Sequence, residues 1–324
     1  MHKNKHYVQG TCLFITSRVE QDLPFITCKL INTAIWGILA RASTLWDISI
    51  CHFLFMSNHF HLIAVVRNPS QVPMFIKQIK QETAAAINRI TGRRQHTIWC
   101  KGFDDPIVLT ADKVRERIKY IYKNPAESHL VGSINHYPGV SSWEMYKNKE
   151  TQRKSLWLKR SCFERINNLH LISSTQQSKI ITKLAGDDPE YLTFTLSPDA
   201  WMDCFPEYET VDREQENWRL IQEILSEEKK IGHPRGVVGV DKLKTMPINK
   251  EFKSRKFGKR MYCISSDIGL RKKYINYLKS ATRKAKEAYK AIKNGICNII
   301  FPPGMFMPGG YFLDPLPPDL FLAT

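Results

Sequence analysis

The alternation of hydrophobic and polar positions over the first 130 residues predicts short strands interleaved with long helices. The predicted strands cover 11–16, 47–55 and 59–67, and the predicted helices cover 27–42, 68–89 and 111–123. Asn124-Pro125 should end the last helix, because proline lacks a backbone N–H and restricts the residue before it. The order predicts an α+β fold with an antiparallel sheet and helices on one face, as in ferredoxin-like and RNA-recognition folds.

The second half of the chain has a different pattern, which predicts a separate and mainly helical region. Residues 211–230 have helical spacing, with Trp218 and Ile221 on the apolar side, and residues 270–293 form a strongly basic helical pattern. The charged stretch 148–165 indicates a linker or an exposed helix. We therefore expect two units, residues 1–150 and residues 151–324, the second being a basic C-terminal region with DNA binding as a candidate role.

Charge narrows the class of partner. The chain carries a formal net charge of +17 and has a pI of about 9.5, which favours an anionic partner, most often nucleic acid. A solvated basic surface is the alternative. Eight cysteines occur without a C-x-x-C pair, so zinc-ribbon motifs have no support. No signal peptide or membrane-length apolar run is visible, and we expect a reducing, cytoplasmic location and no membrane partner.

The pair His59 and His61 marks the start of one predicted strand. Successive side chains of a strand point to opposite faces, so the two imidazoles share one face while Phe60 and Leu62 pack on the other. Two adjacent imidazoles form half of a metal site.

A tyrosine and an asparagine in the helix predicted at 111–123 can complete this site. Tyr120 and Asn124 are four residues apart, which places them on the same helix face. The asparagine amide can offer a carbonyl oxygen to a metal. A tyrosine hydroxyl, with an ordinary pKa of about 10, needs a polarised phosphate to act as a nucleophile at neutral pH. These four residues therefore predict metal-assisted attack on a phosphodiester. Tyr122 is a rival nucleophile, but it projects from another face of the helix.

Several motifs in order resemble the REP-associated tyrosine transposases, within the HUH single-strand transposases. A family stretch like "MPNHVHLL" is matched by residues 56–63, one like "YIHNNPVRAGLV" by residues 120–131, and a "WSSY"-like ending by residues 140–146. Asn88-Arg89 and Gly92-Arg93-Arg94 match further pieces of the family pattern. The resemblance covers about residues 10–146 and weakens beyond 150.

The resemblance implies a transposase that cleaves and rejoins single-stranded hairpin DNA. Tyr120 would form a 5′-phosphotyrosine and release a 3′-hydroxyl, while His59, His61 and Asn124 would bind Mg²⁺ or Mn²⁺. No nucleotide cofactor is needed, because the phosphotyrosine conserves the energy of the bond. Five residues are candidates for contacts with DNA: Arg18, Arg89, Arg93, Arg94 and Lys123.

The chain departs from the family pattern after Asn124-Pro125, where Glu127 replaces a basic residue. Two other functions remain open at this point. One is a non-catalytic relative that holds hairpin DNA or RNA, and the other is an HUH relaxase or replication-initiator nickase. Either a monomer or a homodimer is compatible with the sequence.

Overall fold

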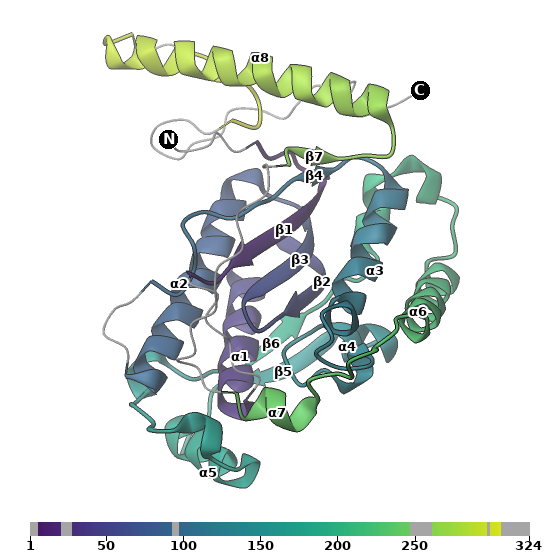
Figure 1. Cartoon of the computed structure of the whole chain (residues 1–324). Helices are drawn as coiled ribbons and strands as arrows, with labels where there is room; N and C mark the ends of the chain where they lie inside the picture. The colour runs from purple at the N-terminus through teal and green to yellow at the C-terminus, as the bar shows by residue number, and fades with distance from the viewer. Residues whose placement is uncertain (1–5, 21–27, 93–96, 247–260, 297–298, 306–324) are drawn as a thin grey trace.

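A five-stranded sheet forms the centre of the molecule (Figure 1). The structure, a computed structural model, describes residues 6–20, 28–92, 97–246, 261–296 and 299–305. The strands are β1 (Cys12–Arg18), β2 (Ile48–Phe55), β3 (His59–Val66), β4 (Ile107–Val108) and β7 (Cys263–Ile264). Their order is β2-β3-β1-β4-β7, antiparallel except for the parallel pair β4-β7. The expected α+β class with an antiparallel-rich sheet is confirmed.

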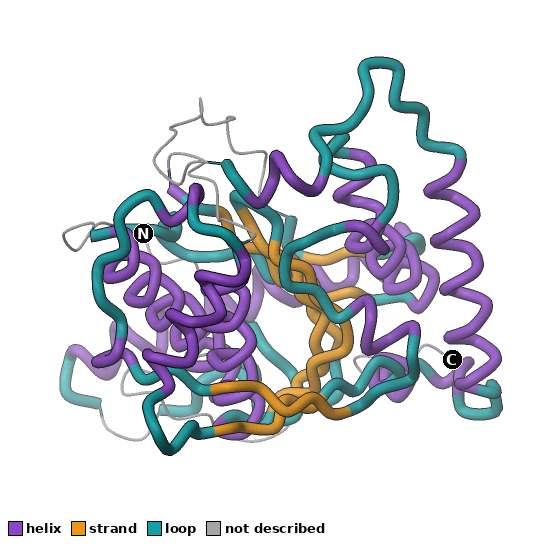
Figure 2. Tube along the Cα trace, turned by 90° about the horizontal axis from the view of Figure 1, so that it is seen from below, coloured by secondary structure: helices purple, strands orange, loops and turns teal. Residues whose placement is uncertain are grey.

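Helices cover both faces of this sheet, rather than the one face expected (Figure 2). Helices α1 (Lys29–Leu45) and α2 (Val72–Thr91) share one hydrophobic core with Leu13 and Leu62, and α3 (Ala111–Glu127) shares a second core with Phe14 and Ile63. The strands are apolar on both sides, so each face must be covered.

Local signals fix the ends of the long helices. Before α2, the Asn68 side chain accepts a hydrogen bond from the backbone N–H of Ser70, and α2 ends at Gly92, which has φ +67°. Glycine adopts this left-handed conformation without a steric penalty. Helix α3 continues through Pro125 to Glu127 instead of ending at Asn124. A proline near a helix end removes one hydrogen bond without stopping the last turn, so Asn124 is fully helical.

The first part of the C-terminal region packs directly onto α1. Strands β5 (Gln152–Leu156) and β6 (Tyr191–Thr195) pair antiparallel, which corrects the expected linker or exposed helix. Phe194 is fully buried, and its ring centroid lies 5.5 Å from that of Trp36 on α1. A Cβ at Gly37 of α1 would lie 2.5 Å from the Leu156 carbonyl oxygen, so the glycine permits this close approach.

The remaining helices differ in how closely they join the body. The bounds are α4 (Trp143–Lys147), α5 (Ser174–Ala185), α6 (Arg213–Lys229), α7 (Val240–Lys244) and α8 (Ile268–Lys293). Helix α6 packs against α3, whereas α8 lies along the outside, beyond β7 (Figure 1). Trp218, expected on the buried side of α6, is 60% exposed, because the helix buries Leu220 and Ile224 instead.

Residues from both sides of the expected boundary at 150 line both main cores. Leu158 and Phe194 belong to the α1/α2 core, and Trp201 and Leu220 belong to the α3 core. The division into 1–150 and 151–324 stays a prediction about folding units. No helix in the described ranges is long and apolar enough to cross a membrane.

Candidate active site

The two histidines lie at the start of β3, opposite the end of β1. In the antiparallel register His59 pairs with Arg18, and His61 pairs with Thr16. Phe60 and Leu62 point into the α1/α2 core, while His61 stacks on Phe14 on the α3 side with ring centroids 5.3 Å apart. The strand alternation therefore puts both imidazoles on the face that α3 covers, as predicted.

Hydrogen bonds orient both imidazoles. The ring centroids of His59 and His61 are 4.6 Å apart. His59 Nδ1 lies 2.7 Å from Asn58 Oδ1, and His61 Nδ1 lies 2.9 Å from the Thr16 hydroxyl oxygen. A neutral imidazole that donates from Nδ1 keeps its Nε2 lone pair for a ligand. Both rings can therefore keep the Nε2 lone pair for a ligand.

Burial keeps both histidines neutral. It lowers the pKa of His59 to about 4, with Arg18 adding to the effect. Burial also lowers the pKa of His61 well below its ordinary value, helped by His59, Arg18 and Arg117. Neutral imidazoles at pH 7 are metal ligands and poor phosphate binders.

Helix α3 brings Tyr120 and Asn124 to the same place. The ring centroid of Tyr120 lies 5.2 Å from that of His61, and the Asn124 amide nitrogen lies 3.3 Å from His61 Nε2. Asn124 is buried, whereas Tyr120 is half-buried. The four residues selected from the sequence therefore converge from two elements, although more than 50 positions separate the histidines from Tyr120.

The donor set fits a divalent cation with open coordination positions. The Asn124 amide faces His61 Nε2, and the His59 ring lies next to that of His61. The Asn124 oxygen accepts a hydrogen bond from the Ser128 hydroxyl at 3.1 Å. A half-turn of the Asn124 amide would exchange its nitrogen and oxygen and present the oxygen to a cation. No described cluster of three or more His, Cys, Asp or Glu side chains offers another metal site.

Tyr122, the rival nucleophile, occupies a core position. Its side chain is fully buried, and its oxygen lies 2.8 Å from His52 Nδ1 and 2.9 Å from the Ser142 hydroxyl oxygen. Burial raises the pKa of Tyr122 well above its ordinary value. The side chain that the helix presents to the histidines is that of Tyr120.

The five residues expected to contact DNA have different environments. Arg18 is exposed beside His59, and Arg89 is exposed but donates a hydrogen bond to the Arg160 carbonyl oxygen at 2.6 Å. Lys123 is paired with Glu227 and Glu127. Arg93 and Arg94 lie outside the described residues.

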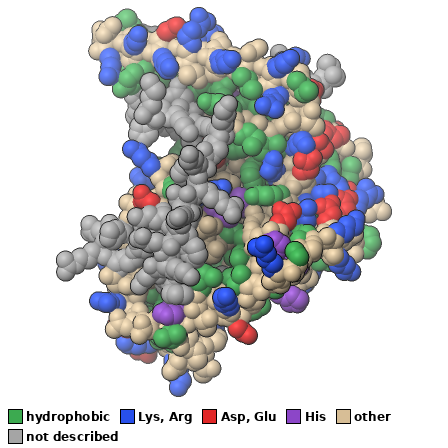
Figure 3. Space-filling view, viewed as in Figure 1, with side chains coloured by type: hydrophobic (Ala, Val, Ile, Leu, Met, Phe, Trp, Pro, Cys, Tyr) green, Lys and Arg blue, Asp and Glu red, His purple; other side chains and the backbone are tan. Residues whose placement is uncertain are grey.

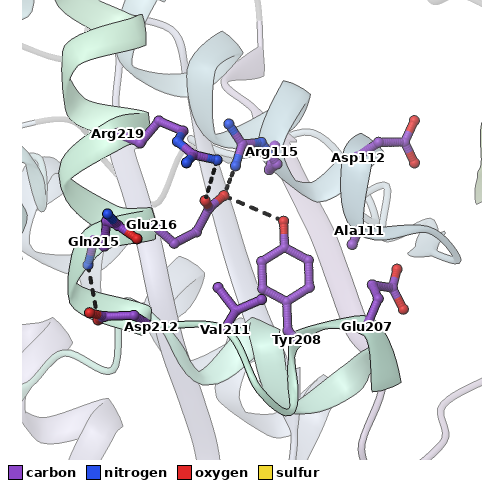
Figure 4. Close-up of a pocket in the computed structure, with 10 residues that line it drawn as sticks. All are labelled: Ala111, Asp112, Arg115, Glu207, Tyr208, Val211, Asp212, Gln215, Glu216 and Arg219. Carbon is purple, nitrogen blue, oxygen red and sulfur yellow. Dashed lines mark hydrogen bonds and ion pairs between the residues drawn. The ribbon is translucent and has the colours of Figure 1, made fainter.

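Opposite the candidate site, α3 carries a row of ion pairs with α6. Arg115, Lys119 and Lys123 occur every fourth residue on α3. They pair with three glutamates of α6: Glu216, Glu223 and Glu227. Glu216 is buried. It also accepts a hydrogen bond from Tyr208 and pairs with Arg219 (Figure 4). An open pocket of about 580 Å³ lies here, and none of the four candidate residues lines it.

Sequence reasoning missed Arg117, which lies one turn before Tyr120. Its guanidinium carbon is 5.4 Å from the ring centroid of Phe14 and 5.7 Å from that of Tyr120. The spacing of 117, 120 and 124, three and then four residues apart, is the signal that could have placed Arg117 on the face of the site.

Comparisons with known proteins support the family resemblance. Residues 18–124 match the model of the family described as "Transposase IS200 like". This segment, which contains all four candidate residues, is similar to IS200-like transposases. A solved REP-associated tyrosine transposase bound to a REP hairpin aligns at 15% identity with a TM-score of 0.40, covering 46% of this chain and 86% of that one. No curated protein matches this chain.

Proposed function

We propose that this chain cleaves and rejoins single-stranded hairpin DNA, with Tyr120 as the nucleophile. The observation that carries the proposal is the convergence of His59 and His61 from β3 with Tyr120 and Asn124 from α3. The match to IS200-like transposases over 18–124 supports the same class of reaction. The hairpin substrate follows from the resemblance of the motifs.

The chemistry assigns a separate task to each side chain. His59, His61 and Asn124 would hold Mg²⁺ or Mn²⁺, which when bound supplies polarisation of the scissile phosphate. The Tyr120 oxygen forms a bond to phosphorus and loses its proton, the bond from phosphorus to the 3′ oxygen breaks, and that oxygen takes up a proton. The phosphotyrosine keeps the bond energy, so the 3′-hydroxyl can return in the reverse step.

The exposed face of α8 is proposed as a surface for the DNA backbone. Six of its cations lie in one row, at positions 272, 279, 283, 286, 290 and 293. At 100° per residue these positions fall within about 80° of each other, opposite the buried alanines. None of them has an ion pair with another described residue, and Figure 3 shows blue side chains along this helix. Such a row suits phosphates.

The experiment is a covalent-adduct assay. A 3′-labelled hairpin with single-stranded flanks is incubated with the protein and Mn²⁺ and separated under denaturing conditions, because a 5′-phosphotyrosine retains the fragment that carries the 3′ end. Wild type should form a protein–DNA adduct, and Tyr120→Phe should form none. Tyr122→Phe is the matched control on the same helix and should still form the adduct.

Other outcomes separate the alternatives. Hairpin binding that persists in a chelator without any adduct under either metal would favour a non-catalytic binding protein. An adduct that survives Tyr120→Phe but disappears in Tyr122→Phe would overturn the assignment of the nucleophile. Nicking without rejoining would favour a nickase over a transposase.

A further inference from the structure

Arg117 is the exception among the cations of α3. Four others have carboxylate partners: Lys113, Arg115, Lys119 and Lys123. Arg117 makes no ion pair with any described residue, and its Nε atom is shielded from solvent without a hydrogen-bond partner there. An N–H group of a charged side chain that is neither solvated nor paired is unfavourable.

Helix geometry explains why Arg117 is different. Residues 117, 120 and 124 are three and four apart and therefore share a face of α3, whereas residues 115, 119 and 123 lie on the face toward α6. The carboxylates of α6 consequently neutralise one side of the helix. The guanidinium on the other side is directed toward the same group of rings as Tyr120.

Aromatic rings hold this guanidinium beside the histidines. It lies over Phe14 and over Tyr120, and Phe14 in turn stacks on His61 with an interplanar angle of 15°. Stacking of this kind fixes the plane of a guanidinium while its N–H groups stay available. Arg18, exposed opposite His59, adds a second positive charge to the same edge.

An anion would stabilise this arrangement of positive charges. A divalent cation on His59, His61 and Asn124 would repel Arg117 unless negative charge lay between them. A phosphate can bind both the divalent cation and Arg117. Its negative charge attracts the cation, and its non-bridging oxygens accept paired hydrogen bonds from a guanidinium.

We propose that Arg117 binds the non-bridging oxygens of the phosphate that Tyr120 attacks. The inference rests on the proposed function and adds a substrate contact to it. As the Tyr120 oxygen bonds to phosphorus and the bond to the 3′ oxygen breaks, negative charge accumulates on the non-bridging oxygens. Arg117 is placed to stabilise this charge, and loss of one such donor commonly slows a reaction roughly 10²–10³-fold.

The first test measures binding without catalysis. Hairpin DNA is made with either a normal phosphate or an uncharged methylphosphonate at the mapped cleavage position, and affinities are measured in chelator. Wild type should bind the methylphosphonate roughly tenfold more weakly, whereas Arg117→Gln should bind both DNAs equally. Lys113→Gln, one turn earlier on α3, is the matched control and should behave like wild type.

The second test measures the rate of adduct formation with Mn²⁺. Arg117→Gln and Arg117→Met should both be slowed roughly 10²–10³-fold. The methionine variant keeps an unbranched stem over Phe14 and Tyr120, so it separates loss of charge from loss of packing. Arg117→Lys should recover part of the rate, because it restores charge without the planar fork.

Failure of this proposal differs from failure of the proposed function. If wild type forms an adduct and the Arg117 variants match it in rate and in the methylphosphonate comparison, Arg117 is a packing residue and the inference is overturned. If no protein forms an adduct, inorganic phosphate is titrated instead. Stabilisation of wild type by phosphate that disappears in Arg117→Gln and Arg117→Met would uphold the anion site, and equal stabilisation of all three would reject it.

Discussion

Two parts of the C-terminal half differ in how they pack against the rest of the protein. The part that contains β5, β6 and α6 completes both main cores, and its glutamates neutralise the outer face of α3. Helix α8 lies outside, and its row of cations has no carboxylate partners among the described residues. Red and blue side chains adjoin each other over α6, whereas blue dominates along α8 (Figure 3).

This difference shows that positive charge along a sequence has two separate uses here. Arg115, Lys119 and Lys123 of α3 pair with glutamates of α6, whereas the row of cations on α8 faces solvent. The paired cations of α3 are already cancelled by glutamates in the formal net charge of +17, so they contribute nothing to the positive surplus. Truncations and substitutions in these two parts of the protein test the difference between them.

Truncation should give the largest effect. A chain ending at residue 150 lacks Phe194, Trp201 and Leu220, so both cores would be open to water, and we expect no cooperative unfolding. A chain ending at residue 266 keeps these residues and should unfold cooperatively, at a somewhat lower temperature than the full chain. Thermal unfolding followed by circular dichroism tests both, and cooperative unfolding of the shorter chain would support an independent domain 1–150.

Disrupting the contact between α3 and α6 should have the next largest effect. Glu216 is 5% exposed and pairs with Arg115. If the Glu216 carboxylate is lost, Arg115 keeps only its ion pair with Glu223. We expect Glu216→Gln to lower the free energy of unfolding by about 2–3 kcal/mol. Glu214→Gln is the control, because the Lys149–Glu214 pair is exposed and should contribute under about 1 kcal/mol. Denaturant titration measures both, and equal effects would contradict the structural role of Glu216.

Acidification should weaken the packing around His52, a buried residue of β2 that contacts Pro198. His52 Nε2 donates to the Pro198 carbonyl oxygen at 2.9 Å, so Nδ1 of the neutral ring accepts from Tyr122. Burial lowers the pKa of His52 to about 3, below the unfolded value of about 6.5. Stability from this group is therefore present above pH 6.5 and is lost as the pH falls toward 3.

The size of this effect is about 1.4 kcal/mol for each pH unit, since the unfolded state binds one more proton than the native state. His52→Gln should be less stable near neutral pH but should show a pH dependence that is shallower by this amount. Denaturant titrations between pH 7 and pH 4 measure the slope. An unchanged slope in the variant would show that His52 is not the group responsible.

Neutralising α8 should have the smallest effect on stability and a clear effect on DNA. Replacing Lys279, Arg283, Lys286 and Lys290 with glutamine should change the free energy of unfolding by less than about 0.5 kcal/mol, because all four are exposed. The slope of log affinity against log salt for a hairpin should become shallower by up to about 3.6. The control replaces four exposed lysines elsewhere: Lys154, Lys159, Lys179 and Lys183. An equal change in both variants would mean that α8 is only a solvated helix.

Sequence alone determined three of the strands, the three long helices and the choice of candidate residues in the first 130 positions. Two-residue alternation placed His59 and His61 on one strand face, and helical spacing placed Tyr120 and Asn124 on one helix face. These relations are local, so they follow from the backbone geometry of a single element. The α+β class followed from the order of those elements.

Tertiary structure decided which charges are paired, which faces are covered and what completes the site. Nothing in the sequence near Lys123 showed that Glu227 of α6 neutralises it. Nothing near Arg117 showed that its guanidinium lies over the ring of Phe14 in β1. The charged stretch after residue 148 became β5 because it pairs with β6, about 40 residues later. Such contacts join segments that are distant along the chain, and their free energy depends on burial and on partners that no local pattern specifies.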